Sequence, residues 1–348
     1  MVSKKVDFIL VGQGIAGSWL ALELIKRNYS IHVINKETED TASFKAAGLY
    51  NPITGRKMKL TWKAEELFSD LENNYREAES LLQTNFLHSK SIYRPFREIE
   101  EKNDWDGKID DDITTQFVEQ IHSESLGYKG IKDPLGGLKI KKSGYVDLKT
   151  FILSLRRLLI DRGFYHPKVF DYSEVEFKDG KVDYKGIQAQ KVIFCEGPNT
   201  NNPFWNELPF KLVRGEVIDI ECGLKADVII NRGVFIIPKG NYHTVGSTYD
   251  HKVLSFQPQK EGIEELKRRF GQLFEGPYRI VEKRAGVRPA TYDRKPFIGI
   301  SPINETLGIF NGFGTKGVSL APYFAKQFVD TLEGKSKIEK QADVQRVY

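Results

Sequence analysis

Apolar residues follow two different periods at the start of the chain. A β-branched run over 6–11 meets Gly12, and after Gly17 apolar residues recur at helical spacing until Ile25. A second apolar run then covers 31–35. Because a strand, a glycine turn, a helix and a strand follow one another within about thirty residues, the pattern predicts a β-α-β unit with parallel strands.

Helical patterns recur further along the chain. The segment 62–82 is amphipathic, and 147–159 is a strong helix led by Asp147 as its N-cap. The segments 261–270 and 318–332 are also predicted to be helices.

Short apolar runs bounded by Gly and Pro predict the other strands. The run 191–196 ends at a second strand-to-turn corner, 307–312 reads as a strand, and 212–256 reads as several antiparallel strands. The segment 86–142 is rich in Asp, Glu, Lys and Gly with only short apolar runs. It is predicted to be a small β-rich insertion rather than part of the core sheet.

Composition excludes several classes of protein. The 348 residues are 40% hydrophobic, which suits a globular protein and excludes a disordered one. Cys195 and Cys222 cannot form a disulfide framework, and no spacing typical of a metal site occurs, so we expect reduced thiols, a cytoplasmic location and no metal. The net charge of +5 is mild and does not demand a nucleic-acid partner. Polar residues interrupt the apolar stretch 6–25, which argues against a secretory signal and a membrane span.

The first turn carries a candidate phosphate-binding loop. The sequence from Gly12 to Gly17 matches G-x-G-x-x-G directly after a strand and at the start of a helix. Gly12 would allow the tight turn, Gly14 would let the backbone approach a pyrophosphate, and Gly17 would let the helix pack on the strand. The predicted ligand is a dinucleotide.

The second strand leaves the identity of the dinucleotide open. A ribose-binding carboxylate is expected at its end, but Asn35 and Lys36 stand there. An amide oxygen can accept one ribose hydrogen bond, whereas a lysine suits a 2′-phosphate. These two residues alone are compatible with FAD and with NADP.

Later motifs resemble one known family. They are SFKAAGLYNP at 43–52, RGEV at 214–217, strands at 235–238 and 246–248, RAGVRPATYDRKPFIG at 284–299 and GFGTKGVSLAP at 312–322. In this order, over nearly the whole chain, they resemble the D-amino-acid oxidase family of FAD-dependent oxidoreductases. That family includes glycine oxidase, sarcosine oxidase and the FAD domain of a bifunctional tRNA wobble-uridine modification enzyme.

The resemblance implies an α/β fold in two parts. A discontinuous Rossmann-type FAD-binding domain would comprise 1–85, 143–205 and 285–348. A β-rich α+β substrate domain would comprise 86–142 and 206–284. The active site would lie between them, where ligand sites commonly form.

The resemblance also places cofactor-binding residues. They belong to the glycine loop and the end of the second strand (Gly12, Gly14, Ile15, Ala16, Gly17, Asn35, Lys36), to a segment beside the flavin (Ser43, Ala46, Ala47, Gly48), to the second corner (Cys195, Gly197), and to the turn before the last helix (Gly312, Gly314, Thr315, Lys316, Gly317). Small residues let the backbone approach a flavin ring, and a helix N-terminus stabilises the negative charge of a reduced flavin. Cys195 is expected to be a packing thiol near the cofactor rather than a flavin attachment point.

The substrate residues implied by the resemblance are cationic. Arg288 stands where relatives bind the substrate carboxylate, with a structural ion pair as its alternative role. Arg284 matches an arginine of the tRNA-modifying relatives, and His243 lies on a strand where substrate-facing residues occur. Lys316 is expected to act catalytically by adding positive charge, with a surface lysine as the alternative. Phe235 replaces a tyrosine found in amino-acid oxidases, which argues against a simple glycine-like substrate.

The expected activity is oxidation of a C–N bond in a small amine or amino acid, with hydride transfer to flavin N5 and reoxidation by O₂ or another acceptor. FAD is the expected cofactor. Two alternatives stay open. One is modification of a tRNA wobble uridine, which is not favoured because no basic stripe stands out. The other is an FAD-binding or NADP-linked Rossmann protein without amine oxidase activity.

Overall fold

The first sheet is built around the predicted β-α-β unit. The computed structural model describes residues 4–55, 57–107 and 112–348. Strand β1 (Lys4–Val11) pairs in parallel with β2 (Ile31–Ile34) and with β14 (Ile187–Phe194), and α1 (Ile15–Lys26) connects β1 to β2. The sheet continues in parallel with β11 (Tyr165–His166) beyond β2 and β21 (Leu307–Asn311) beyond β14. Antiparallel strands complete it, namely β20 (Phe297–Ile300), β13 (Lys181–Tyr184) and β12 (Val175–Lys178).

Both faces of this parallel sheet are covered. On one face lie α1, α3 (Ala64–Leu82), α6 (Leu148–Asp161) and α8 (Gly317–Leu332), which share one apolar core. The other face is covered by the segments around Phe170 and Trp205. Burial on both faces explains why the central strands are continuous apolar runs rather than alternating ones. Asp147 caps α6 as predicted, since its carboxylate accepts the Thr150 N–H at 3.1 Å.

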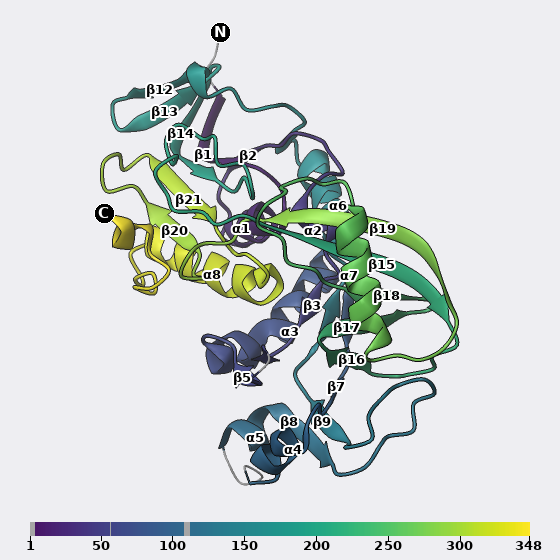
Figure 1. Ribbon diagram of the computed structural model, residues 1–348. Coiled ribbons are helices and arrows are strands. Elements are labelled where there is room, and N and C mark those ends of the chain that lie inside the picture. Colours follow the sequence, from purple (N-terminus) through teal and green to yellow (C-terminus); the bar gives the residue numbers. More distant parts are fainter. Residues whose placement is uncertain (1–3, 56, 108–111) are drawn as a thin grey trace.

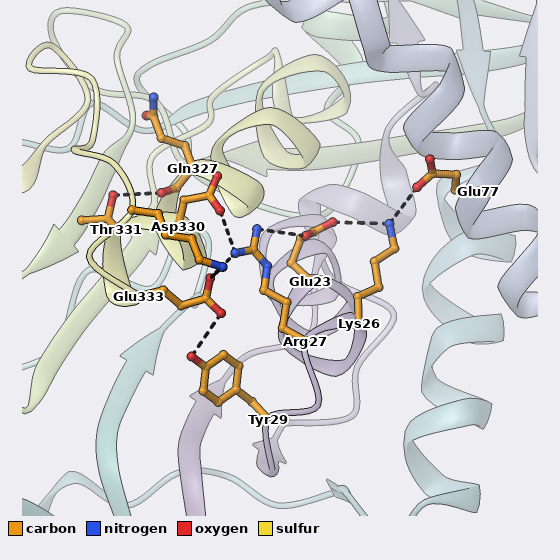
Figure 2. Close-up of polar contacts among 10 residues, drawn as sticks. Glu23, Lys26, Arg27, Tyr29, Glu77, Gln327, Asp330, Thr331 and Glu333 are labelled. Atoms are coloured by element: carbon orange, nitrogen blue, oxygen red, sulfur yellow. Dashed lines mark hydrogen bonds and ion pairs between the residues drawn. The ribbon is translucent and has the colours of Figure 1, made fainter.

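A cluster of ion pairs connects the end of α1 to the end of α8 (Figure 2). Arg27, at the end of α1, donates to Asp330 at 2.7 Å and to Glu333 at 2.5 Å, both in the region where α8 ends. Lys26 reaches Glu77 of α3 at 3.1 Å. Residues more than 300 positions apart in the sequence are thus joined beside the parallel sheet.

The second sheet is mostly antiparallel (Figure 1). Its strands, in spatial order, are β19 (Tyr278–Arg288), β15 (Val213–Cys222), β18 (Tyr242–Gly246), β17 (Val234–Lys239), β16 (Ile229–Arg232), β7 (Ile92–Pro95), β9 (Gly137–Ile140) and β8 (Val118–His122). Only the β16–β7 pair among these neighbours is parallel in the described structure. Helix α7 (Lys260–Gly271) packs on one face over a core that includes Ile218, Ile236 and Leu266.

Short elements connect the two sheets. They are the strands β3 (Leu49–Tyr50), β10 (Gly144–Val146), β6 (Leu87–Ser89), β4 (Ile53–Thr54) and β5 (Lys59–Leu60), the helices α2 (Ala42–Lys45), α4 (Ile99–Asp106) and α5 (Asp112–Phe117), and the 3₁₀ turns η1 (Tyr172–Glu174) and η2 (Val344–Val347). Helix α2 lies against β19, so the segment after the second strand touches both sheets.

The predicted α/β fold class is confirmed, with a Rossmann-type parallel sheet and a mostly antiparallel second sheet. The β-rich insertion predicted at 86–142 agrees with the structure, in which its strands lie outside the parallel sheet, but its helices were not predicted. This segment adds β7, β9 and β8 to the second sheet and also carries α4 and α5, because its short apolar strands find partners far away in sequence. The domain boundaries stay predictions. The boundary at 285 falls within β19, and residues 1–3, 56 and 108–111 of the predicted domains lie outside the described residues.

Candidate functional site

A cavity of about 1320 Å³ lies where the carboxyl ends of β1, β2, β14 and β21 meet one face of the second sheet. The carboxyl edge of a parallel sheet is where α/β folds bind ligands. Pockets for drug-sized ligands typically measure about 300–1,000 Å³, so this cavity has room for more than one ligand of that size.

The glycine loop forms one wall of the cavity and requires its glycines. Gly12 has a φ of +96°, and a Cβ there would lie 2.6 Å from the Cys195 carbonyl oxygen. A Cβ at Gly17 would lie 2.0 Å from the Gly12 carbonyl oxygen, so helix α1 packs directly on the turn. Gly14, Ile15 and Ala16 line the cavity, whereas Gly17 lies behind it. The backbone therefore forms a cradle without side chains, which is suited to a pyrophosphate.

Asn35 ties the second strand to this loop. Its Oδ1 accepts the Gln13 N–H at 2.8 Å, and its Nδ2 donates to the Tyr165 hydroxyl at 3.1 Å. Both Asn35 and Lys36 line the cavity. The amide therefore shapes the loop as well as facing the ligand space. The first of these roles could not be predicted from the sequence.

The segment 43–48 crosses between the two sheets. The Ser43 hydroxyl accepts the Ile15 N–H at 3.0 Å, at the start of α1. Gly48 has a φ of +77°, and a Cβ there would lie 1.9 Å from the Val146 carbonyl oxygen. Ser43, Ala46, Ala47 and Gly48 all line the cavity. Small residues are required here because the chain passes between β10 and the ligand space.

The two strand-end corners are joined by one side chain. Asn311 Oδ1 accepts the Gly312 N–H at 2.8 Å, and its Nδ2 donates to the Gly197 carbonyl at 2.9 Å. The turn that follows β21 leads into α8. The predicted residues of these corners, which are Gly197, Gly312, Gly314, Thr315, Lys316 and Gly317, all line the cavity.

Lys316 is the N-cap residue of α8 and lines the cavity. Burial and the nearby charge of Arg294 lower the pKa of Lys316. A cationic side chain and the N-terminus of a helix thus bring positive charge to the same part of the cavity.

Cys195 and Glu196 directly follow β14 and line the cavity. Burial raises the pKa of the Cys195 thiol, so the thiol stays protonated and packs against α1. Burial also raises the pKa of Glu196, although Asn202 donates to it at 2.7 Å. Sequence reasoning missed Glu196, whose only signal was its position directly after a buried strand.

Arg288 projects from the end of β19 into the cavity. Its Nη2 donates to Ser247 Oγ at 3.0 Å, its Nη1 donates to the Thr248 carbonyl at 3.2 Å, and the guanidinium lies 4.8 Å from the centre of the Tyr249 ring. Within the part of the chain that the structure describes, no carboxylate forms an ion pair with Arg288. Burial lowers its pKa. Tyr249 also lines the cavity, and sequence reasoning missed it.

Arg284 and His243 lie elsewhere. Arg284 donates to Asp219 through both terminal nitrogens and to Glu282 at 2.8 Å, so its charge is neutralised. His243 is buried near the Cys222 sulfur, at 3.6 Å, and pairs with Ile220 on the sheet. Neither residue is among the described residues that line the cavity. The substrate-binding role predicted for these two residues is therefore not retained.

The parallel sheet, the glycine cradle and the cavity at the strand ends define a dinucleotide-binding oxidoreductase fold. A family model described as FAD dependent oxidoreductase (DAO) matches residues 7–331, and the chain belongs to this family. The protein is thus an FAD-dependent oxidoreductase, and its cofactor is FAD rather than NADP.

Relatives and solved structures agree with this assignment. The chain is 22% identical to glycine oxidase of Geobacillus kaustophilus over 96% of this chain and 94% of that protein. It is 22% identical to the bifunctional tRNA 5-methylaminomethyl-2-thiouridine biosynthesis protein MnmC of Idiomarina loihiensis, over 94% of this chain but only 56% of that protein. The chain thus spans about half the length of that relative.

The fold is similar to solved structures at low sequence identity. The crystal structure of the Geobacillus kaustophilus glycine oxidase superposes with a TM-score of 0.77 at 20% identity, covering 97% of this chain and 96% of that one. Iminodiacetate oxidase from a Chelativorans species gives 0.80 at 17% identity, covering 96% and 97%. No helix within the described residues is both long and apolar enough to span a bilayer.

Proposed function

We propose that this protein oxidises the C–N bond of an amino acid or a related small amine whose carboxylate is bound by Arg288. The observation that carries the proposal is the guanidinium of Arg288. It lies in the cavity with its two bonds directed to a hydroxyl and a carbonyl rather than to a carboxylate. A planar guanidinium can bind a carboxylate through two parallel hydrogen bonds, which would fix the orientation of the α-carbon.

The surroundings of Arg288 support this role. Tyr249 lies under its guanidinium, and Ser247 Oγ accepts from one terminal nitrogen. These contacts restrict the side chain before substrate arrives, which lowers the entropy cost of binding. The named relatives glycine oxidase and iminodiacetate oxidase act on compounds of this class, which agrees with the proposal.

FAD, when bound, supplies the acceptor for the hydride that leaves the substrate carbon. The chain's own contribution is position and charge. Lys316 and the N-terminus of α8 bring positive charge to the cofactor part of the cavity, which favours acceptance of negative charge there. The substrate amine must be neutral, because its lone pair forms the new C=N bond as the hydride departs. The imine product then hydrolyses in water.

Absorbance spectra of the FAD-loaded protein test the proposal. A panel of amino acids and amines is added without oxygen, and bleaching of the flavin bands reports oxidation. We expect Arg288→Ala to weaken substrate binding about 10–100-fold, the loss expected for a charged hydrogen-bonded pair. Arg288→Lys keeps the positive charge but cannot form two parallel hydrogen bonds. Its substrate affinity should therefore lie between those of the unchanged protein and Arg288→Ala.

The matched control is Arg279→Ala, which removes an exposed arginine paired with Glu221 outside the cavity. It leaves the rate of bleaching unchanged. A protein whose flavin no amine or amino acid bleaches, although dithionite does, contradicts the proposal. Bleaching that is equally fast after Arg288→Ala contradicts the role of Arg288.

The tRNA-modification alternative loses one of its supports, because Arg284 is neutralised by Asp219 and Glu282. The similarity to part of MnmC still favours testing it. Binding of tRNA that weakens steeply between 50 and 200 mM salt would support this alternative.

A further inference from the structure

Arg94 of β7 and Arg97, which follows this strand, both line the cavity. Strand β7 lies away from β1 and its glycine loop (Figure 1). The function proposed above involves neither of these two arginines. Arg94 lies within an otherwise apolar strand, Ile92–Pro95, and it is the buried charge of that strand. A charged residue in a buried strand is costly unless it has partners, so its presence requires an explanation.

Arg94 is incompletely paired within the protein. Its side chain is 6% exposed, its Nη2 donates to the Gly55 carbonyl at 2.8 Å, and Glu101 lies 3.9 Å away. Its Nε is buried and has no hydrogen-bond partner. Burial and the neighbouring charge of Arg97 lower the pKa of Arg94 to about 10, which leaves the guanidinium protonated at neutral pH.

Arg97 adds a second positive charge beside the first. It is exposed to the cavity, and no carboxylate forms an ion pair with it among residues 4–55, 57–107 and 112–348. Glu101 accepts a hydrogen bond from the backbone N–H of Arg97, at 2.7 Å, and does not pair with the Arg97 guanidinium. Arg232 also lies near, but it donates to the carbonyls of Phe96 and Gln272. Positive charge therefore exceeds negative charge on this wall.

A chain of contacts links Arg97 to Arg288. A Cβ at Gly233 would lie 3.1 Å from Arg97 Nη2, and the Gly233 carbonyl accepts from Arg269. Arg269 also donates to the Ser247 carbonyl at 3.1 Å, and Ser247 Oγ accepts from Arg288. Arg97 and Arg288 thus lie at the two ends of a series of contacts that runs through Gly233, Arg269 and Ser247.

The cavity wall between the two ends includes the apolar side chain of Phe235. Phe235 lines the cavity and pairs with Asn231 of β16 and with Gly246 of β18. A Cβ at Gly246 would lie 2.5 Å from Cζ of Phe235, so the tip of the ring occupies the space next to this glycine. A short aliphatic linker would fit against this surface, with charged groups at both of its ends.

We propose that Arg97 and Arg94 form a second anion subsite, so that the substrate is an amine carrying two anionic groups. One carboxylate would bind Arg288, and a second carboxylate or a phosphonate or phosphate would bind Arg97, with Arg94 behind it. The inference rests on the proposed function for the role of Arg288 but not for the existence of the subsite. It explains why an unpaired guanidinium stands in the cavity and a buried one has an unused donor.

Three compounds that differ in one substituent test the subsite. N-methylglycine, iminodiacetate and N-(phosphonomethyl)glycine share the same glycine unit. Its nitrogen carries a methyl group in the first, a carboxymethyl group in the second and a phosphonomethyl group in the third. Binding to the FAD-loaded protein is measured by isothermal titration calorimetry, and flavin bleaching is followed separately. We expect at least one dianionic compound to bind about tenfold or more tightly than N-methylglycine.

Substitutions identify the residue responsible. Arg97→Ala should abolish the advantage of the dianionic compounds and leave N-methylglycine binding unchanged. Arg97→Lys should keep part of the advantage, and Arg279→Ala, which removes an exposed charge elsewhere, should keep all of it. Preference for iminodiacetate identifies a carboxylate as the second group, and preference for N-(phosphonomethyl)glycine identifies a phosphorus oxyanion.

The outcomes separate the two proposals. Equal affinity for the three compounds, failure of all three to bind, or an unchanged preference in Arg97→Ala overturns the subsite. If the dianionic compounds bind through Arg97 but no compound bleaches the flavin, the subsite stands and the proposed function fails. If the three compounds bind with equal affinity and N-methylglycine bleaches the flavin, the proposed function stands and the subsite fails.

Discussion

Adding one methyl group opposite Arg288 should impair the site without removing its charge. Gly215 of β15 pairs with Gly286 of β19, and the Arg288 guanidinium lies directly over it. A Cβ at Gly215 would lie 2.0 Å from Arg288 Nη2 and 2.3 Å from its Cζ. These atoms are the far end of a flexible side chain. The guanidinium rather than the strand will therefore move in Gly215→Ala.

The structure sets the size of the effect. Displacing Arg288 from the substrate carboxylate removes a charged hydrogen-bonded pair, about 1.5–3 kcal/mol, which corresponds to a loss of about 10–100-fold in substrate affinity. Alanine in place of glycine within a strand stabilises the fold by about 0.5–1 kcal/mol. Thermal unfolding should therefore occur at the same temperature or higher, while the apparent Kd for substrate rises.

A double-mutant cycle with anaerobic flavin bleaching is the decisive assay. Because Gly215→Ala acts through Arg288, it should have little further effect in protein that already carries Arg288→Ala. Additive losses in the double variant would refute the reasoning, since they would show that the methyl group acts on something other than the arginine. A substantial fall in the unfolding temperature would refute the claim that the strand accommodates the change.

Three other substitutions have defined outcomes. Gly17→Ala places a Cβ 2.0 Å from the Gly12 carbonyl oxygen, so it should cost about 1–3 kcal/mol in stability and lower the fraction of protein that carries FAD, measured by absorbance. Burial lowers the pKa of His32 to about 3, below its unfolded value of 6.5. The unfolded chain therefore binds more protons below pH 6.5, and the stability that neutral His32 contributes at neutral pH is lost as the pH falls toward 3. His32→Phe should remove about 1.4 kcal/mol per pH unit of this slope between pH 6 and 4, measured by urea unfolding. Arg27→Ala should cost about 1–2 kcal/mol by the same measurement, because Asp330 loses its ion-pair partner and Glu333 keeps only Lys335, whereas Lys26→Ala on the exposed side should cost less.

Each of these outcomes has a clear contrary result. Full FAD content in Gly17→Ala would mean that the loop tolerates a shift of its backbone. An unchanged pH slope in His32→Phe would mean that His32 titrates normally in the folded protein. Equal losses in the Arg27 and Lys26 variants would mean that the ion pairs to α8 are no stronger than exposed ones.

Local sequence patterns were sufficient to predict the cofactor-binding half of the molecule. The glycine loop lies directly after a strand and directly before a helix, so its conformation depends on neighbours close in sequence. The same holds for Asp147, which caps the helix three residues before its hydrogen-bond partner Thr150. Periodicity and caps report such short-range structure because their physical causes act within a few residues.

Which residues of the other half face the cavity with a free charge depends on how its strands pair. Arg284 and Arg288 lie four residues apart on β19, and alternation alone places them on one face. The register with β15 sets Asp219 near Arg284 and Gly215 beneath Arg288, so one arginine is neutralised and the other is left available. Nothing in the local sequence of β19 distinguishes the two.

The amino-acid sequence by itself therefore determined the α/β fold class and the phosphate-binding turn, and its family resemblance indicated FAD. Only the tertiary structure decided that Arg288 at one end of the cavity and Arg97 at the other have no ion-pair partner among the described residues, and that Arg94 is only partly paired. The reason is physical. A charge is available to a ligand only when no opposite charge lies within a few ångströms, and in this chain the residues that settle this come from strands distant in sequence.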